Sequence, residues 1–264
     1  MAAGEKAILF TPDSCIGCRA CQVACHVWNS TRPEVTDFSP TFTNPPDLLP
    51  NVWTVMEYKE VGEGDSFDWL FFKRQCMHCS NAPCAEACPA GAIEVHPEGA
   101  VVIRQDKCIG CRYCVEACPY DVPRYDPITN KVYKCTMCID RLQNGLEPAC
   151  VSACPTDALV FGDYDELVSK YRAAGYEIYG DSVNDYVGRT HYVYATKRWA
   201  GKLTDPTYFG DHLLKDPRKP AVSFTRSVVR PVGWALTGLT LVGLLGHLAL
   251  WRSKRMEEVK KGGE

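Results

Sequence analysis

Four cysteines lie within the eleven residues CIGCRACQVAC, which run from Cys15 to Cys25. The chain repeats this density of thiols three more times, so its sixteen cysteines form four sets of four. Thiols at such density pair as disulfides, hold a zinc ion, or bind an iron–sulfur cluster. The sets are Cys15, Cys18, Cys21 and Cys25; Cys76, Cys79, Cys84 and Cys88; Cys108, Cys111, Cys114 and Cys118; and Cys135, Cys138, Cys150 and Cys154.

The spacing within the sets is nearly constant. The first and third sets read C-x2-C-x2-C-x3-C, whereas the middle spacer grows to four residues in the second set and to eleven in the fourth. Proline follows the last cysteine in three sets, as Pro89, Pro119 and Pro155, and His26 takes this place in the first set. This run is the bacterial ferredoxin signature, in which the fourth cysteine binds the neighbouring cluster. We therefore expect four [4Fe–4S] clusters, with all sixteen cysteines as iron ligands.

Other kinds of site fit the spacing less well. Structural zinc prefers C-x2-C pairs with a longer spacer between them, a pattern that only the fourth set resembles. A disulfide framework suits shorter, exported chains. The composition, with 46% hydrophobic residues among 264 and a net charge of -3, predicts a folded chain that does not bind nucleic acid.

Cationic residues accompany the cysteines along the sequence. In one interpretation their positive charges offset the negative charge of thiolate-bound clusters and raise the reduction potentials. In the other they are ordinary solvated charges. The six residues are Lys73, Arg74, Lys107, Arg112, Lys134 and Arg141.

Short elements are predicted between and after the cysteine sets. Residues 91–108 are typical of a strand, a turn at Pro97–Gly99 and a second strand. The segment PTDALVFGD, which follows Cys154, is predicted to be the corresponding element of the fourth set. A helix should begin at Asp163 and end at Gly175.

The segment beyond that helix carries no cysteine. Residues Thr190–Thr196 alternate like a strand, and residues 205–220 are predicted to form a proline-punctuated, extended arm. We interpret residues 163–225 as a surface that docks another subunit; a structural wrap over the cluster domain is the alternative.

Residues 231–251 form a run of 21 residues without Asp, Glu, Lys or Arg. As a helix this run is roughly 31 Å long, about the thickness of the hydrocarbon core of a bilayer. Trp234 and Trp251 lie near its ends, where aromatic rings meet the membrane interface. We predict one transmembrane helix rather than a buried core helix. Its one ionisable residue, His247, is interpreted as a neutral, hydrogen-bonded imidazole rather than a haem ligand or a quinone contact.

The order of the four sets resembles that of the four-cluster electron-transfer subunits of respiratory molybdenum and tungsten enzymes. Within this class the chain is most similar to the iron–sulfur (beta) subunit of membrane-bound formate dehydrogenase, and the likeness covers nearly the whole chain. The inserts between the sets and the terminal anchor point to this branch. The stretches that carry the likeness are SCIGCRACQVAC, NPPDLLPNVWTVM, CMHCSNAPCAEACPAGAI, KCIGCRYCVEACPYDVPRY and NKVYKCTMCIDRLQNGLEPACVSACPTDALVFG.

The resemblance implies that the first set pairs with the fourth and the second with the third. The first-and-fourth half would face the catalytic subunit, and the second-and-third half the membrane. The implied ligand groups are Cys15, Cys18, Cys21 and Cys154; Cys25, Cys135, Cys138 and Cys150; Cys76, Cys79, Cys84 and Cys118; and Cys88, Cys108, Cys111 and Cys114.

We therefore expect an α+β fold of two pseudo-symmetric, bacterial-ferredoxin-like modules that hold four [4Fe–4S] clusters, followed by a single transmembrane helix. The expected divisions are a cluster domain at 1–162 with an insert at 26–75, a docking extension at 163–225, the membrane helix at 226–252 and a charged tail at 253–264.

Two classes of function are compatible with such a chain. An electron conduit needs no substrate site, and the sequence has no dinucleotide-binding, P-loop or flavin motif. A catalytic or radical-generating cluster would keep an open iron with three cysteines, whereas every set here has four. The conduit is favoured. The resemblance implies a molybdenum or tungsten alpha subunit and a membrane cytochrome b or quinone-binding gamma subunit as partners; a membrane [NiFe] hydrogenase or another quinone-linked molybdoenzyme is the alternative complex.

The location of the cluster domain follows from the same resemblance. No cleavable export signal is recognised in MAAGEKAILF. A complex on the outer, periplasmic face would then need a partner's twin-arginine signal to carry this chain across already folded, with a cytoplasmic-facing complex as the alternative. Basic residues on the two sides of the membrane helix are balanced, so the positive-inside rule does not decide between them.

Overall fold

The computed structural model describes residues 4–37, 41–183, 186–209, 212–214 and 230–261. The chain divides into two compact units, Met1–Pro220 and Ala221–Glu264. The first unit contains all sixteen cysteines, and the described part of the second is one helix.

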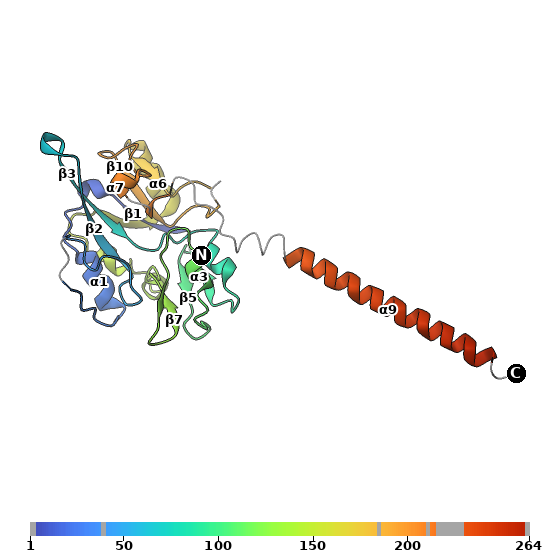
Figure 1. Ribbon diagram of the computed structural model, residues 1–264. Coiled ribbons are helices and arrows are strands. Elements are labelled where there is room, and N and C mark those ends of the chain that lie inside the picture. Colours follow the sequence, from blue (N-terminus) through green and yellow to red (C-terminus); the bar gives the residue numbers. More distant parts are fainter. Residues whose placement is uncertain (1–3, 38–40, 184–185, 210–211, 215–229, 262–264) are drawn as a thin grey trace. The chain divides into compact units, whose positions relative to one another are not determined.

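A four-stranded sheet forms one wall of the first unit (Figure 1). The first strand is parallel to the tenth, with Ile8 opposite Tyr192, and antiparallel to the eighth. In spatial order the strands are β8 (Leu159–Asp163), β1 (Lys6–Phe10), β10 (Tyr192–Thr196) and β9 (Glu177–Tyr179).

Both faces of this sheet are buried, because side chains alternate along each strand. One face packs against helix α6 (Tyr164–Ala173) through Ala7, Leu9, Val193 and Ala195. The opposite face belongs to the large core that contains most of the cysteines, and it contributes Ile8, Phe10, Tyr192 and Tyr194. All five residues of β10 are therefore buried, whereas the sequence predicted an alternating strand.

The predicted helix after the fourth set is α6. Its first residue is preceded by Asp163, whose side chain accepts a hydrogen bond from the Glu166 amide at 3.4 Å. Acidic residues occupy the first turn, where they complement the helix dipole, and Gly175 takes a φ of +83° just beyond the end. The predicted boundaries at Asp163 and Gly175 are confirmed.

Three two-stranded hairpins complete the β-structure. The predicted hairpin around Pro97–Gly99 is confirmed, with Val95 opposite Val101 and Gly99 at a φ of +94°. The hairpins are β2 (Val55–Val61) with β3 (Asp68–Arg74), β4 (Ile93–Val95) with β5 (Val101–Ile103), and β6 (Arg124–Asp126) with β7 (Lys131–Tyr133).

Short helices carry many of the cysteines. Helix α1 packs against α5, and α2 packs against α3, so elements of the first and fourth sets meet, as do elements of the second and third. The helices are α1 (Ala20–Trp28), α2 (Pro83–Ala87), α3 (Tyr113–Ala117), α4 (Ile139–Gln143) and α5 (Ala149–Ser152). Two single turns of 3-10 helix are η1 (Pro12–Ser14) and η2 (Gly64–Ser66).

The arm predicted as extended at residues 205–220 differs from the structure at its start. Residues Pro206–Phe209 form helix α7, and Phe209 is buried against Phe72 and Tyr194. A buried aromatic ring supplies the packing that a one-turn helix lacks on its own. Residues 210–211 and 215–220 lie outside the described part of the chain. The division at residues 162 and 163 stays a prediction.

The second unit is described from residue 230 onward. Helix α9 (Arg230–Lys261) includes the predicted apolar run and continues through the first part of the predicted charged tail. Its stretch Ala235–Met256 is long and apolar enough to cross a membrane. The first residues of the predicted membrane segment, 226–229, lie outside the described ranges.

A glycine in the third cysteine set provides a test of how tightly its loop is packed. Gly110 has a φ of +69°, and a Cβ there would lie 2.2 Å from the carbonyl oxygen of Asn130. Gly145, with a φ of +71°, has open space around it and is the matched control. Gly110→Ala should lower both the thermal midpoint and the iron content of the purified complex, by about four irons if one cube is lost. Gly145→Ala should cost only the backbone strain, about 1 kcal/mol, and keep its iron. Equal behaviour of the two variants would contradict the packing argument.

Candidate cluster sites

All four cysteine sets begin with the same turn. In each C-x2-C loop, the residue before the second cysteine has a left-handed backbone: Gly17, His78, Gly110 and Met137, with φ between +50° and +69°. This conformation directs backbone amides at the first thiol of the set. His78 N–H donates to the Cys76 sulfur and Met137 N–H to the Cys135 sulfur, each at 3.4 Å. Such N–H···S bonds favour the thiolate that a cluster requires.

The end of each set depends on the residue after the last cysteine. Helices α2 and α3 end immediately before Cys88 and Cys118, which are followed by proline. Helix α1 instead continues through Cys25 to Trp28, because His26 stands where the other sets have proline. Asn29 ends this longer helix by donating from its side chain to the Cys25 carbonyl at 2.8 Å, and it lies 3.7 Å from the Cys25 sulfur.

Two of the expected ligand groups each line a single cavity. We name them site A and site D. Each combines cysteines from two sets, and each includes one exposed cysteine, Cys18 in site A and Cys111 in site D. Site A comprises Cys15, Cys18, Cys21 and Cys154, and site D comprises Cys88, Cys108, Cys111 and Cys114.

The other two expected groups lie deeper, and we name them site B and site C. Burial raises the pKa of Cys25, as does the charge on Cys135, Cys150 and Cys138. Cys25 and these three cysteines form site B, and all four are buried. Burial likewise raises the pKa of Cys79, and the negative charges of Cys76, Cys118 and Cys84 raise it further. These four residues form site C, in which Cys118 alone is half-buried.

Electrostatic interactions between cysteines of different groups indicate that the four sites follow one another in a row. Electrostatic interactions connect Cys21 with Cys150, which joins sites A and B. Cys135 interacts with Cys76, which joins sites B and C, and Cys114 interacts with Cys84, which joins sites C and D. The order is therefore A, B, C, D. The family resemblance implied the membership of each group, which stays a prediction, but it did not give this order.

The sulfurs have the chemistry that clusters need. Burial raises the pKa of Cys15 and Cys84 to about 11 and that of Cys21 to about 12, so iron binding must displace protons from these thiols. Among the described residues, no three His, Cys, Asp or Glu side chains converge closely enough to hold a single ion. A cube does not require such convergence, because each of its four irons takes one cysteine.

One buried amide also fits a bound cluster. The side-chain nitrogen of Gln75 has no hydrogen-bond partner among the described residues, and Gln75 is only 2% exposed. Buried donors in native proteins are nearly always paired. Its side-chain oxygen accepts a hydrogen bond from the Lys73 ammonium, which lies among thiols of sites A and B, so the sulfur atoms of a cluster there would supply an acceptor for the amide nitrogen.

Two lysines are buried among the cysteines. Lys73 is fully buried, and its pKa is raised, because the negative charge of Cys150, Cys21, Cys135 and Cys25 outweighs the opposing effect of burial. Lys73 therefore stays charged where sites A and B meet. Tyr192 and Tyr194 of β10 fix its backbone by donating from their hydroxyls to its carbonyl at 3.1 and 2.8 Å.

Lys134 occupies the corresponding place between sites B and C. Burial lowers its pKa, but Cys76, Cys84 and Cys135 raise it above the usual value. Its ammonium donates to the carbonyl of Val101 and to that of Cys135. Of the six cations noted in the sequence, these two have thiols as their main charged neighbours.

The remaining four cations have other partners. Lys107 pairs with Glu94 at 2.9 Å, and Arg74 pairs with Asp47. Arg112 lies over the ring of Tyr125 and Arg141 over that of Trp28. Sequence alone could not separate the two buried lysines from these, since burial is a property of the folded chain.

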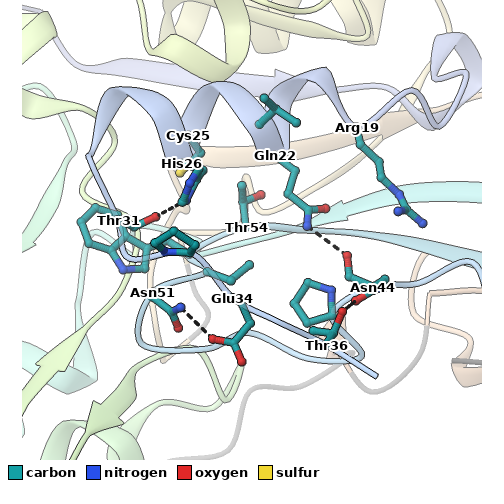
Figure 2. A pocket seen from close by; sticks show the side chains of 15 residues that line it. Arg19, Gln22, Cys25, His26, Thr31, Glu34, Thr36, Asn44, Asn51 and Thr54 are labelled. Carbon is teal, nitrogen blue, oxygen red and sulfur yellow. Dashed lines mark hydrogen bonds between the residues drawn. The ribbon is translucent and has the colours of Figure 1, made fainter. Parts of the chain in front are cut away.

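A cavity of about 380 Å³ flanks site B between α1 and the insert that follows it (Figure 2). Its polar side chains bond to one another across the cavity. Gln22 donates to the Asn44 carbonyl at 3.1 Å, His26 contacts the Thr31 hydroxyl at 2.7 Å, and Asn51 donates to Glu34 at 2.7 Å. The bonds of Gln22 and His26 fasten the insert to α1 beside Cys25, and the bond between Asn51 and Glu34 connects two parts of the insert.

Two family matches together cover all four cysteine sets. Residues 67–164 match a 4Fe-4S dicluster domain, and residues 14–92 match a second family of that description.

Individual relatives extend this likeness over most of the chain. The iron-sulfur subunit of the nitrate-inducible formate dehydrogenase of Escherichia coli K12 is 40% identical over 252 residues, which cover 92% of this chain and 84% of that subunit. The formate dehydrogenase-O iron-sulfur subunit of the same organism is 45% identical over 198 residues, or 72% of this chain and 66% of the relative. A polysulfide reductase subunit of Wolinella succinogenes is 40% identical over 157 residues, or 59% of this chain and 75% of the relative. The chain belongs to the family of formate dehydrogenase iron–sulfur subunits, electron-transfer proteins that carry [4Fe–4S] clusters, as the order of its cysteine sets predicted.

Proposed function

We propose that this chain connects a formate-oxidising molybdenum or tungsten subunit to a cytochrome b or quinone-binding partner in the membrane, and that sites A to D hold one [4Fe–4S] cluster each. When bound, such clusters supply one-electron oxidation and reduction, which the side chains of this chain do not. The observation that carries the proposal is the row of four cysteine groups, whose members are close together although they come from different sets.

Both ends of the row lie at the surface of the first unit. Cys18 of site A and Cys111 of site D are exposed, whereas all four cysteines of site B are buried. The protein therefore insulates the middle of the row from water and leaves its two ends accessible. An arrangement of this kind suits a subunit that receives electrons at one end and delivers them at the other.

Exposed apolar side chains surround the two accessible ends. Ile16 lies between Cys15 and Cys18 in the first C-I-G-C loop, and Ile109 has the same place in the third; they are 59% and 67% exposed. Val23 and Val27 of α1 add to the first surface, and Tyr113 of α3 adds to the second. Apolar surface of this kind favours contact with another subunit. By family likeness we assign site A to the catalytic partner and site D to the membrane partner.

No catalytic step is assigned to this chain. Each of the four groups supplies a cysteine for every iron of its cube, so the proposed ligand sets leave no iron open to a substrate. The relative from W. succinogenes is named as part of polysulfide reductase, so related proteins belong to other complexes. The longer match to formate dehydrogenase subunits, 92% of this chain against 59%, favours formate as the donor of this complex.

The membrane is the third proposed partner. Helix α9 would anchor the chain, with the cluster domain at 1–162, the docking extension at 163–225, the membrane segment at 226–252 and the charged tail at 253–264. We place the cluster domain on the outer face, carried there folded with its partner.

The sharing of ligands between sets can be tested within one helix. Cys21 and Cys25 are a single turn apart in α1, yet they belong to sites A and B. We expect Cys21→Ser and Cys154→Ser to alter the same electron paramagnetic resonance signal of the reduced complex, and Cys25→Ser to alter a different one together with Cys150→Ser. Iron analysis of each variant accompanies the spectra. A shared signal for Cys21 and Cys25 would rule out the proposed groups, and zinc in place of iron would rule out the clusters.

Removal of a buried charge should change potentials without removing ligands. Lys73→Met keeps the length of the side chain but removes the charge at the junction of sites A and B. Because an added electron loses a neighbouring cation, the midpoint potentials of those two sites should fall by on the order of 100 mV. Lys107→Met is the control, since Lys107 is half-exposed and paired with Glu94. Equal shifts in a redox titration of the two variants would contradict the special role of Lys73.

The side of the membrane on which the cluster domain lies can be measured directly. Protease added to intact cells should digest the cluster domain while a cytoplasmic marker protein stays whole. Digestion only after the inner membrane is opened would place the domain on the cytoplasmic side and overturn this part of the proposal.

A further inference from the structure

His78 occupies a position at which glycine would be less strained. The equivalent residues of the first and third sets are Gly17 and Gly110, and all three have a left-handed backbone. A residue with a side chain is strained in this conformation, because its Cβ approaches a carbonyl oxygen. Met137 of the fourth set shares this conformation, so a role for the imidazole has to follow from its contacts and not from the strain alone. His78 is completely buried.

The ring of His78 lies between two of the cysteine groups. Its Nε2 is 3.5 Å from the sulfur of Cys135, a member of site B. The backbone amide of the same residue donates to the sulfur of Cys76, a member of site C, at 3.4 Å. One residue therefore contacts a thiol of each of two adjacent sites.

Hydrogen bonding determines which ring nitrogen carries the proton. The backbone amide of Val101 donates to Nδ1 of His78 at 3.0 Å, so Nδ1 is an acceptor and has no hydrogen. The proton of the neutral ring is then on Nε2, which faces Cys135. The contact at 3.5 Å is an N–H···S hydrogen bond with the imidazole as donor.

The surroundings hold this ring in place. His191 donates to the carbonyl of His78 from its backbone amide at 3.1 Å and from Nδ1 at 2.7 Å, and its own Nε2 lies 2.6 Å from a Glu5 oxygen. Burial lowers the pKa of His78, and the positive charges of Lys134, His191 and Lys73 lower it further. The neutral ring agrees with the hydrogen bond that Nδ1 accepts from the Val101 amide.

We propose that His78 is a positioning residue for the junction of sites B and C: its Nε2–H hydrogen bond to Cys135 raises the reduction potential at site B, and its backbone bond to Cys76 ties that donor to site C. The inference rests on the proposed ligand groups. A donor to a ligating sulfur withdraws electron density from it, which favours the reduced cluster. The residue also supplies a continuous path of covalent and hydrogen bonds between the two sulfurs.

Two substitutions separate the donor from the rest of the side chain. His78→Asn suits the left-handed backbone, and its oxygen can replace Nδ1 as the acceptor for Val101, but no donor reaches Cys135. His78→Gln extends an amide nitrogen to about the place of Nε2 and restores that donor. Met137→Asn is the matched control, because Met137 has the same place in the fourth set and loses no side-chain donor.

The experiment is a redox titration of the purified complex, monitored by electron paramagnetic resonance, with iron content measured on the same samples. In His78→Asn, the ratio of reduced to oxidised cluster at site B should fall about tenfold at a fixed ambient potential, which is about 59 mV for one electron. His78→Gln should recover most of this ratio, and Met137→Asn should show no fall. Iron should stay at the wild-type level in all three variants.

The outcomes that would overturn the role of His78 can be distinguished from one another. Unchanged potentials in His78→Asn with full iron would overturn the inference, as would an equal fall in Met137→Asn, since packing alone would then explain it. If His78→Asn fails to assemble, His78→Gln decides: a wild-type potential supports the donor role, and a lowered potential or lost iron overturns it. Failure of the ligand groups themselves is recognised separately, because Cys135→Ser would then leave every cluster signal unchanged.

Discussion

Negative charge in an apolar interior is the constraint on which this structure depends. Most of the sixteen thiols lie in the interior, where burial raises the pKa of those at the centre, so the thiolate form has to be stabilised by groups that the fold supplies. Lys73 and Lys134 provide two full charges, and backbone amides of the C-x2-C loops provide hydrogen bonds to sulfur. An isolated buried ammonium is costly, yet here each ammonium lies among several thiols. The lysines favour the thiolate form of their cysteine neighbours, and bound iron would add the remaining positive charge.

The four-stranded sheet is the element that keeps this arrangement rigid. Its alternating side chains serve two cores, with Val193 and Ala195 against α6 and with Tyr192 and Tyr194 toward the cysteines. The hydroxyls of those tyrosines fix the backbone of Lys73, which lies far away in sequence. Strand β10 comes from the part of the chain that has no cysteine, so this part has a structural role in the cluster domain. Docking of another subunit by its outer surface is compatible with that role.

Local pattern explains which features the sequence could predict. The turn at Pro97–Gly99 and the helix that begins at Asp163 depend on neighbouring residues, and both were predicted correctly. Contacts between distant residues could not be predicted in this way. Lys73 resembles Lys107 in the sequence, but only the fold buries one and exposes the other. The same holds for β10, whose full burial requires α6 on one side and the cysteines on the other.

The residue in the left-handed turn of each cysteine set differs between the ends and the middle of the row. Gly17 and Gly110 satisfy the left-handed turn at no steric cost, and their loops, each with an exposed isoleucine, lie at the two ends of the row. His78 and Met137 satisfy the same turn with strain, and their loops lie in the buried middle of the row, where sites B and C meet. At the ends a side chain on this residue would crowd the loop, since a Cβ on Gly110 meets a carbonyl oxygen. In the middle there is no solvent to stabilise charge, so a side chain that donates to sulfur or excludes water has a use that outweighs the strain.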